Sequence, residues 1–282
     1  MNVGVNIRTF DFKPLPVEIE VKDLKFIKEL PKLLGQPHKA AFYQVLWIAD
    51  GEASCRIDFR EICIKSNEIL IISPGQVCEF DTKSDYSGKM ILFTGSFFSI
   101  TELDSGFLHT SEILNPVSLN KTVPICPQLA KNLITLLDEE LKNTTDNFQA
   151  EITQNYLRII LLEAERQLTS AYSPVISDVG RNFYNMVEHN FRKNRNTDYY
   201  SNLLGVSEKT LSKEVKILAG KTPKVYIDSR IILEAKRLLA YSSLSVKEIG
   251  FELGFDEPTN FNKYFRKHTG HTPVLFRDSV KK

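Results

Sequence analysis

A stretch of about twenty residues occurs twice between positions 200 and 276, and the two copies align when the first is shifted by fifty positions. The first copy opens with Leu204-Gly205-Val206-Ser207 and ends with Gly220-Lys221-Thr222-Pro223. The second opens with Leu253-Gly254-Phe255-Asp256 and ends with Gly270-His271-Thr272-Pro273. Each copy predicts a helix, a tight turn and a second helix that carries cations. Because a duplicated unit fixes the architecture before any single residue is interpreted, we predict two helix-turn-helix units in this half of the chain.

The net charge divides the chain at the same place. Residues 181–282 carry 19 Lys and Arg against 11 Asp and Glu, whereas residues 1–180 carry 17 against 24. Halves of opposite sign indicate two domains, one of which meets a polyanion. No apolar run approaches the roughly 20 residues of a membrane span, and the amino terminus lacks the pattern of a signal peptide. We therefore expect a cytoplasmic protein without a membrane partner.

Residues 42–93 have the pattern of a β-domain. Short β-branched and aromatic runs alternate with turn signals, which is typical of a sandwich or small barrel. The expected strands are 42–48, 54–59, 62–65, 68–72, 77–80 and 89–94, with a turn at Asp50-Gly51. Loops and short helices are expected over 95–127. The four cysteines show no Cys-x-x-Cys spacing and predict reduced, mostly buried thiols.

Two amphipathic helices follow the β-domain. The apolar face of the first is marked by Leu129, Leu133, Leu136, Leu137 and Leu141. The second is marked by Ile152, Tyr156, Ile159 and Ile160 and by the stretch 163–168. Such a hairpin packs on its own barrel or pairs with a second subunit, and we favour a homodimer. The expected domains are 1–170 and 180–282, joined by a linker at 171–179.

The second half predicts helices throughout. Ser207 is the expected N-cap of a helix that runs to Ala219, and a longer helix is expected over 224–240. Ser245 and Glu248 have the spacing of a capping box, in which each side chain satisfies a free backbone amide. Pro258 fits the first turn of the next helix, where its missing N–H costs nothing.

The outward faces of the two second helices carry hydrogen-bonding side chains. The predicted DNA contacts are Lys209, Ser212, Lys213 and Lys216 in the first copy, and Thr259, Asn262, Lys263 and Arg266 in the second.

A helix-turn-helix places its second helix in the major groove of double-stranded DNA. Lys213 and Lys263 suit guanine and Asn262 suits adenine, while Lys216 and Arg266 suit phosphate. The alternative is a solvated cationic face, but cations at matching positions in two copies favour an operator-binding surface.

The second half resembles the DNA-binding domain of the AraC/XylS family of bacterial transcription regulators. The resemblance is carried by residues 249–255, by residues 260–267, and by Gly270-His271-Thr272-Pro273 with Phe276-Arg277. It implies seven helices, with two helix-turn-helix units joined by a long helix, and RNA polymerase as a further candidate partner. Gly250 stands where the family usually has alanine, and a mid-helix glycine costs about 0.5–1 kcal/mol.

The first half resembles the cupin-like effector domain of the same family, in residues 37–38, 42–43, 50–51, 57–59 and 72–77. Metal-binding cupins carry ligands at positions matching His38, Ala40, Gln44 and Cys78, and His38 alone is a histidine here. One imidazole cannot hold a metal that requires three or four protein ligands. We therefore expect no metal, no cofactor and no catalytic residue, and His38 at the surface or at a pocket rim.

A small-molecule pocket in the barrel is the expected place for an effector. Its candidate ligand-binding residues are His38, Tyr43 and Trp47, although strand aromatics usually fill the core. The predicted fold is an α+β multidomain chain, with a cupin-like β-barrel, a helical hairpin and an all-α domain of two helix-turn-helix units. The predicted function is effector-responsive transcriptional regulation. The alternatives are a cupin-type metalloenzyme with an accessory helical domain, and a regulator that acts through dimerisation alone.

Overall fold

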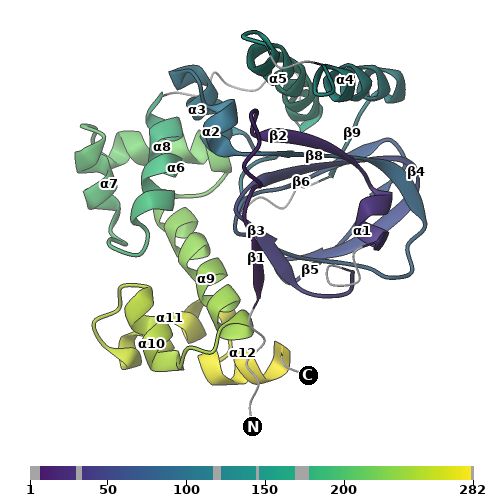
Figure 1. Cartoon of the computed structure of the whole chain (residues 1–282). Helices are drawn as coiled ribbons and strands as arrows, with labels where there is room; N and C mark the ends of the chain where they lie inside the picture. Colours follow the sequence, from purple (N-terminus) through teal and green to yellow (C-terminus); the bar gives the residue numbers. More distant parts are fainter. Residues whose placement is uncertain (1–6, 30–33, 117–121, 144–145, 169–177, 281–282) are drawn as a thin grey trace. The chain divides into compact units, whose positions relative to one another are not determined.

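The computed structural model describes residues 7–29, 34–116, 122–143, 146–168 and 178–280 (Figure 1). The chain divides into two compact units, one spanning Arg8–Ser173 and the other containing Pro174–Lys282. Most of the predicted linker at 171–179 lies outside the described residues. Its last two residues, Asp178 and Val179, begin helix α6.

The amino-terminal unit is a curled β-sheet. Its described strands are β1 (Arg8–Phe10), β2 (Ile19–Asp23), β3 (His38–Ala40), β4 (Tyr43–Ile57), β5 (Arg60–Lys65), β6 (Glu68–Ile72), β7 (Val77–Phe80), β8 (Tyr86–Phe93) and β9 (Thr122–Pro124). They follow the order β1-β3-β7-β4-β6-β9, with β5 also beside β4, and β8 paired to both β2 and β4. Strands β1 and β3 are parallel, and the other pairs of named strands are antiparallel. A short helix, α1 (Lys25–Glu29), follows β2.

Strand β4 belongs to both halves of the curled sheet. Its first part pairs with β6 and β8 over residues 43–51, and its second part pairs with β5 and β7 over residues 52–57. The register with β8 shifts between Ile48 and Asp50. The predicted turn at Asp50-Gly51 is therefore wrong. The chain continues there through a β-bulge, and the extra residue bends the strand so that the sheet closes into a barrel.

The bulge also changes which side chains of β4 point into the barrel. Leu46 and Ile48 before it share one buried cluster with Cys55 and Ile57 after it. Trp47 lies in a different cluster, between the sheet and the helices. Because alternate residues of a strand face opposite sides, one extra residue moves the inward positions from even to odd numbers.

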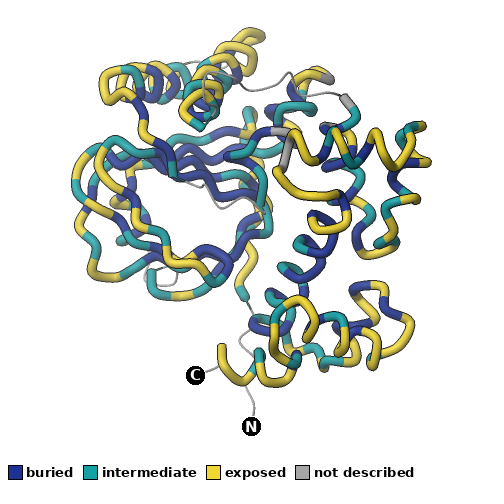
Figure 2. The backbone as a smooth tube through the Cα atoms, turned by 180° about the vertical axis from the view of Figure 1, so that it is seen from behind, coloured by how far each residue is buried: buried dark blue, intermediate teal, exposed yellow. Residues whose placement is uncertain are grey.

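Helices pack on the outer face of this sheet. They are α2 (Gly95–Phe98), α3 (Glu102–Thr110), α4 (Pro127–Glu140) and α5 (Gln149–Leu168). Figure 1 shows α4 and α5 side by side over the barrel, and Figure 2 shows buried strand residues beneath their exposed outer turns. The predicted hairpin is thus confirmed, whereas β9 is a strand that the sequence pattern did not indicate.

The hairpin buries fewer of its predicted residues than expected. Leu133, Leu137 and Ile160 are buried as predicted, as is Ala164 within the predicted stretch 163–168. Leu157 is also buried, although the prediction omitted it. Three predicted inward residues are exposed instead: Leu136, Ile152 and Ile159. The second helix thus has two apolar faces, one against the sheet and one toward solvent.

The carboxy-terminal unit is helical. Its described helices are α6 (Asp178–Asn190), α7 (Thr197–Leu203), α8 (Glu208–Ala219), α9 (Pro223–Tyr241), α10 (Val246–Glu252), α11 (Pro258–Thr269) and α12 (Pro273–Val280). The predicted cap at Ser207, the capping box of Ser245 with Glu248, and Pro258 in the first turn of α11 are all confirmed. The seven helices within the described residues match the number that the family resemblance implies.

A charge network joins α6 to the long helix α9. The Arg230 guanidinium donates to both carboxylate oxygens of Glu188, at 2.9 and 2.8 Å, and to Glu234 at 3.1 Å. Arg192 also donates to Glu234, at 2.9 Å. Burial alone would raise the pKa of Glu234, but the attraction of Arg230 and Arg237 outweighs it and lowers the pKa to about 2.

The four cysteines carry free thiols. Cys55 and Cys78 are buried, as predicted, whereas Cys63 and Cys126 are exposed. Burial raises the pKa of both inner thiols, so they keep their protons.

Candidate DNA-binding surface and effector cavity

The first candidate surface lies on α8. Leu211 and Val215 are fully buried on one side of this helix. On the opposite side Lys209, Lys213 and Lys216 are exposed, and Ser212 is half-buried. Ser207 fixes the start of the helix, since its hydroxyl accepts a hydrogen bond from the backbone amide of Thr210 at 3.1 Å. The four candidate side chains therefore share an outward face, as the spacing predicts.

The second candidate surface lies on α11. Phe261 and Phe265 are fully buried, which turns the rest of the helix outward. The exposed candidates are Thr259, Asn262, Lys263 and Arg266. The surface is thus cationic and rich in hydrogen-bonding groups, which are the requirements for reading a major groove.

Asp228 on α9 anchors α11 from behind. The Tyr264 hydroxyl donates to the Asp228 carboxylate at 2.7 Å, and the Lys224 ammonium pairs with it at 2.9 Å. Burial together with the nearby Asp228 raises the pKa of the Tyr264 phenol, so this donor keeps its proton. The orientation of α11 is therefore tied to the connecting helix by a hydrogen bond as well as by its buried phenylalanines.

Packing against α11, rather than helix propensity, explains why position 250 is a glycine. A Cβ at this position would lie 3.2 Å from the Cβ of Phe261, closer than ordinary contacts allow. The missing methyl group therefore lets α10 and α11 approach each other at the centre of the second helix-turn-helix. The propensity cost of the glycine is offset by this close contact.

A cavity of about 360 Å³ lies in the amino-terminal unit. Most of its wall is apolar and comes from Phe10, Phe12, Phe26, Phe42, Met90 and Leu92. His38, Ala40 and Gln44 also line it, together with four charged residues, Asp11, Lys13, Glu20 and Lys22. Three of the four positions that correspond to cupin metal ligands therefore converge on one apolar cavity, and the fourth, Cys78, contacts His38.

His38 is buried, at 4% exposure, and lines the cavity. Of its two predicted places, the surface and a pocket rim, the surface is therefore wrong. Its Nδ1 lies 3.0 Å from the Gln36 carbonyl, which can only accept, so Nδ1 carries the proton. Its Nε2 lies 3.2 Å from the Cys78 sulfur and accepts from the thiol. Burial lowers the pKa of His38, which keeps the ring neutral. Both ring nitrogens are thus occupied within the protein.

The cavity does not fit a metal ion. No group of three or more His, Cys, Asp and Glu side chains among the described residues could hold one. The cavity instead has the apolar walls and sparse polar groups that are typical of a small-molecule site.

Tyr43 and Trp47 lie away from this cavity. Tyr43 stacks on Phe93 at 5.0 Å between ring centroids, and Trp47 is buried in the cluster under α4 and α5. The site prediction missed Gln44, which occupies the opposite face of β4 and lines the cavity together with Phe42, the residue directly before the strand. Strand alternation was the available signal, but it does not say which face surrounds a cavity.

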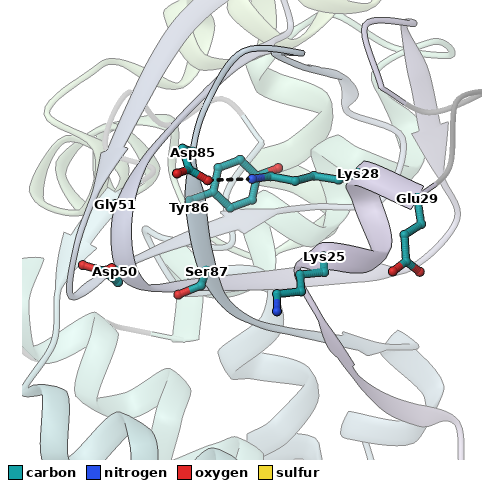
Figure 3. A pocket seen from close by; sticks show the side chains of 8 residues that line it. All are labelled: Lys25, Lys28, Glu29, Asp50, Gly51, Asp85, Tyr86 and Ser87. Carbon is teal, nitrogen blue, oxygen red and sulfur yellow. Dashed lines mark hydrogen bonds and ion pairs between the residues drawn. The ribbon is translucent and has the colours of Figure 1, made fainter.

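A second pocket, of about 550 Å³, opens between α1 and the strands β4 and β8 (Figure 3). Lys28 pairs with Asp85 at 3.1 Å and lies 4.7 Å from the centre of the Tyr86 ring. Lys25 and Asp50 add further charges to its sides (Figure 3). Its polar, charged lining makes the apolar cavity the better candidate for an apolar ligand.

Two family models match this chain along most of its length. The model described as the AraC-like ligand binding domain matches residues 31–156, and the helix-turn-helix domain matches residues 200–279. The chain belongs to the AraC family. Its two matched regions coincide with the barrel and hairpin and with the cationic helical unit, and neither model describes an enzyme. The metalloenzyme alternative is therefore not supported.

Curated relatives of this AraC-family chain are transcription factors by name. The HTH-type transcriptional activator RhaS of Enterobacter sp. (strain 638) is 22% identical over 150 residues, which are 53% of this chain and 54% of that protein. RhaS of Escherichia coli (strain K12 / DH10B) is 29% identical over 87 residues, 31% of each protein. The chain thus spans about half, or less, of the length of these relatives.

One solved structure to which this chain is similar is ToxT from Vibrio cholerae, with 15% sequence identity and a TM-score of 0.44. The match covers 94% of this chain and 98% of the ToxT chain. The DNA-binding domain of AdpA, in complex with a target DNA, is 24% identical with a TM-score of 0.34, over 37% of this chain and 95% of that one.

Among the described residues, no helix is long and apolar enough to cross a membrane.

Proposed function

We propose that this chain is a sequence-specific transcriptional regulator that binds double-stranded DNA and responds to a small-molecule effector. The observation that carries the proposal is the pair of exposed cationic faces on α8 and α11, at equivalent positions of two helix-turn-helix units. A solvated face would not need cations at matching positions in both. The domains proposed for this function are 1–170 for effector binding and dimerisation, 171–179 as linker, and 180–282 for DNA.

In the proposed complex α8 and α11 enter successive major grooves. Lys213, Lys263 and Asn262 contact base edges, while Lys216 and Arg266 contact phosphates and set the position of the protein. Lys209, Ser212 and Thr259 complete the two reading faces. The 19 residues of α9 span about 28 Å at 1.5 Å per residue. With the flanking turns, this length suits two helices placed one DNA turn apart, about 34 Å.

The apolar cavity is the proposed effector site, with His38 in its wall. An effector shifts the protein toward the arrangement that it binds better, and only this difference in affinity changes DNA binding. Tyr43 and Trp47, on the outer face of β4, are proposed to support the wall of the site from behind.

A homodimer through α5 fits the exposed side of the hairpin. Ile152, Asn155, Ile159 and Leu162 follow each other at spacings of three and four residues and form one stripe. The three apolar members are 37%, 42% and 46% exposed. A stripe of this kind is the seam of a helix pair, and an asparagine within it favours one register.

The dimer is tested by sedimentation of the full chain. Ile159→Lys places a charge in the stripe and is expected to give monomers, whereas Gln167→Lys, off the stripe, is expected to leave the dimer intact. A wild-type protein that sediments as a monomer at micromolar concentration would rule out this part of the proposal.

RNA polymerase is a further proposed partner, because the curated relatives are named transcriptional activators. DNA and RNA polymerase place the proposed activity in the bacterial cytoplasm.

The DNA-binding proposal is tested by selecting sequences from a random double-stranded library with the full chain. Enrichment of one motif, with loss of binding to its scrambled version, is expected. A library without enrichment would refute sequence-specific binding.

A further inference from the structure

Gln44 is a buried polar side chain without a partner inside the apolar cavity. It lies on β4, is only 6% exposed and lines the cavity. Its side-chain amide makes no hydrogen bond with any residue that the structure describes. Buried amides are nearly always hydrogen-bonded, because leaving one unpaired in apolar surroundings costs free energy. The unmet donor and acceptor of Gln44 therefore point to a ligand.

Besides Gln44, five polar side chains line the cavity: Asp11, Lys13, Glu20, Lys22 and His38. His38 is neutral, with one ring nitrogen donating to Gln36 and the other accepting from Cys78. Lys22 forms a close ion pair with Glu20, and its ammonium lies 5.1 Å from the centre of the Phe26 ring. His38 and Lys22 therefore have their hydrogen-bonding or charge requirement met within the protein. Asp11 and Lys13 are exposed and carry opposite charges.

This arrangement leaves the cavity lining without a net positive charge, because Asp11 and Glu20 balance Lys13 and Lys22. An anion placed beside Gln44 would lose its hydration and would have to compete with Glu20 for Lys22, while Asp11 offsets the charge of Lys13. His38 is neutral and offers no further charge. A buried charge without a partner is strongly unfavourable. A neutral polar group loses far less, because the Gln44 amide can donate to it and accept from it at once.

The aromatic walls set the shape of the rest of the ligand. Phe12 packs edge-to-face on Phe42 with 5.4 Å between ring centroids, and Phe10 packs the same way on His38 at 5.7 Å. Ring faces and edges of this kind favour a flat apolar body, which continues the same packing.

We propose that the cavity takes an uncharged, largely aromatic molecule that carries one amide, carbonyl or hydroxyl group, and that Gln44 is the residue that selects this group. The inference rests on the proposed function for the role of this molecule as effector. The ligand class itself follows from the cavity alone.

The test compares three probes of one skeleton by titration calorimetry on the full chain: biphenyl, biphenylcarboxamide and biphenylcarboxylate. The carboxamide is expected to bind at least tenfold more tightly than the carboxylate, which has the same shape and a charge. Gln44→Leu is expected to weaken carboxamide binding about tenfold or more, because it removes the hydrogen bonds. The same variant is expected to bind biphenyl as tightly as the wild type or more so, which shows that the cavity is intact.

Gln128→Leu, on the exposed surface of α4, is the matched control and should change none of the three affinities. The proposal is overturned if the carboxylate binds as well as the carboxamide, if Gln44→Leu leaves carboxamide binding unchanged, or if none of the probes binds. DNA affinity is then measured with and without the carboxamide. Binding through Gln44 without a change in DNA affinity supports the ligand class and contradicts the effector role.

Discussion

Gly254 and Gly205 occupy the same place in the two helix-turn-helix turns and offer a matched pair of substitutions. Both have a left-handed backbone, with φ of 75° and 64°. A Cβ at Gly254 would lie 1.8 Å from the carbonyl oxygen of Arg192, whereas a Cβ at Gly205 would have no neighbour within 4 Å. Alanine therefore imposes the same backbone strain at both positions but a collision at only one.

Backbone strain and the collision with Arg192 can be given separate free energies. An alanine held in the left-handed region costs about 1–2 kcal/mol, and this applies equally to Gly205→Ala and Gly254→Ala. At Gly254 the turn must also move away from the Arg192 carbonyl by more than 1 Å to reach an ordinary contact distance, which adds about 1–3 kcal/mol of overpacking. We expect Gly254→Ala to destabilise the second unit by about 2–5 kcal/mol and Gly205→Ala the first by about 1–2 kcal/mol.

Hydrogen exchange of the full chain, read by mass spectrometry, reports each unit separately. In Gly254→Ala, peptides from α10 and α11 are expected to exchange faster than in the wild type by a factor of roughly thirty or more. In Gly205→Ala, peptides from α7 and α8 are expected to exchange only about fivefold to thirtyfold faster. Equal increases in the two variants would refute the reasoning, because they would show that the contact with Arg192 contributes nothing.

Four further changes test other parts of the molecule. Lys263→Ala should weaken binding to the selected DNA by about 1–3 kcal/mol and relax one base preference, measured by fluorescence anisotropy on single-base variants. Lys216→Ala should weaken binding to all sequences and lower the slope of log affinity against log salt by about one unit. Tyr264→Phe removes the donor to Asp228 and should destabilise the second unit by about 1 kcal/mol, measured by exchange in α11. The pKa of Glu234 in the folded protein is about 2, against an ordinary 4.5. The ionised carboxylate should therefore stabilise the folded state by about 3 kcal/mol above pH 4.5. This stabilisation should be lost as the pH falls toward 2, which urea unfolding at a series of pH values measures.

The contrary results are equally definite. Unchanged DNA affinity in Lys263→Ala would show that Lys263 makes no base contact. An altered base preference in Lys216→Ala would show that Lys216 contacts a base rather than a phosphate. Unchanged exchange in Tyr264→Phe would show that the buried phenylalanines hold α11 alone. Glu234→Gln should lose the acid dependence attributed to Glu234, and a curve identical to that of the wild type would assign it to other carboxylates.

The helix-turn-helix half was predictable because its signals are local. Ser207, Ser245 and Pro258 each act on backbone groups within three residues, so their roles at helix starts can be inferred without knowledge of the fold. The buried positions Phe261 and Phe265 follow from helical spacing alone. Which bases the outward residues contact stays a prediction, since it depends on a partner that the chain does not contain.

The strands of the barrel could be predicted from the sequence, but the β-bulge next to Asp50 could not. Asp50-Gly51 has the composition of a two-residue turn, and the same residues serve equally well in a β-bulge. The difference is made by the partner strands, because β8 pairs with residues on both sides of the bulge. Pairing across such separations in sequence leaves no mark in the residues themselves.

The cavity was the least predictable feature. Tyr43 and Gln44 are neighbours in sequence, and strand alternation predicts only that they face opposite sides. The aromatic residue was the more obvious candidate, yet it stacks on Phe93 under the helices. A second reason is that Phe10 and Phe12 reach the cavity from the start of the chain, where the sequence mixes strand-like and irregular segments.

The bulge in β4 makes chain length, rather than residue type, the property that must be preserved between Ile48 and Asp50. Many substitutions there would leave the inward and outward positions on both sides unchanged. Deletion of Ala49 would instead turn residues 52–57 over, so that Cys55 and Ile57 would face solvent and Ser54 and Arg56 would face the barrel. A single lost codon at this point would therefore damage the effector domain more than almost any single substitution.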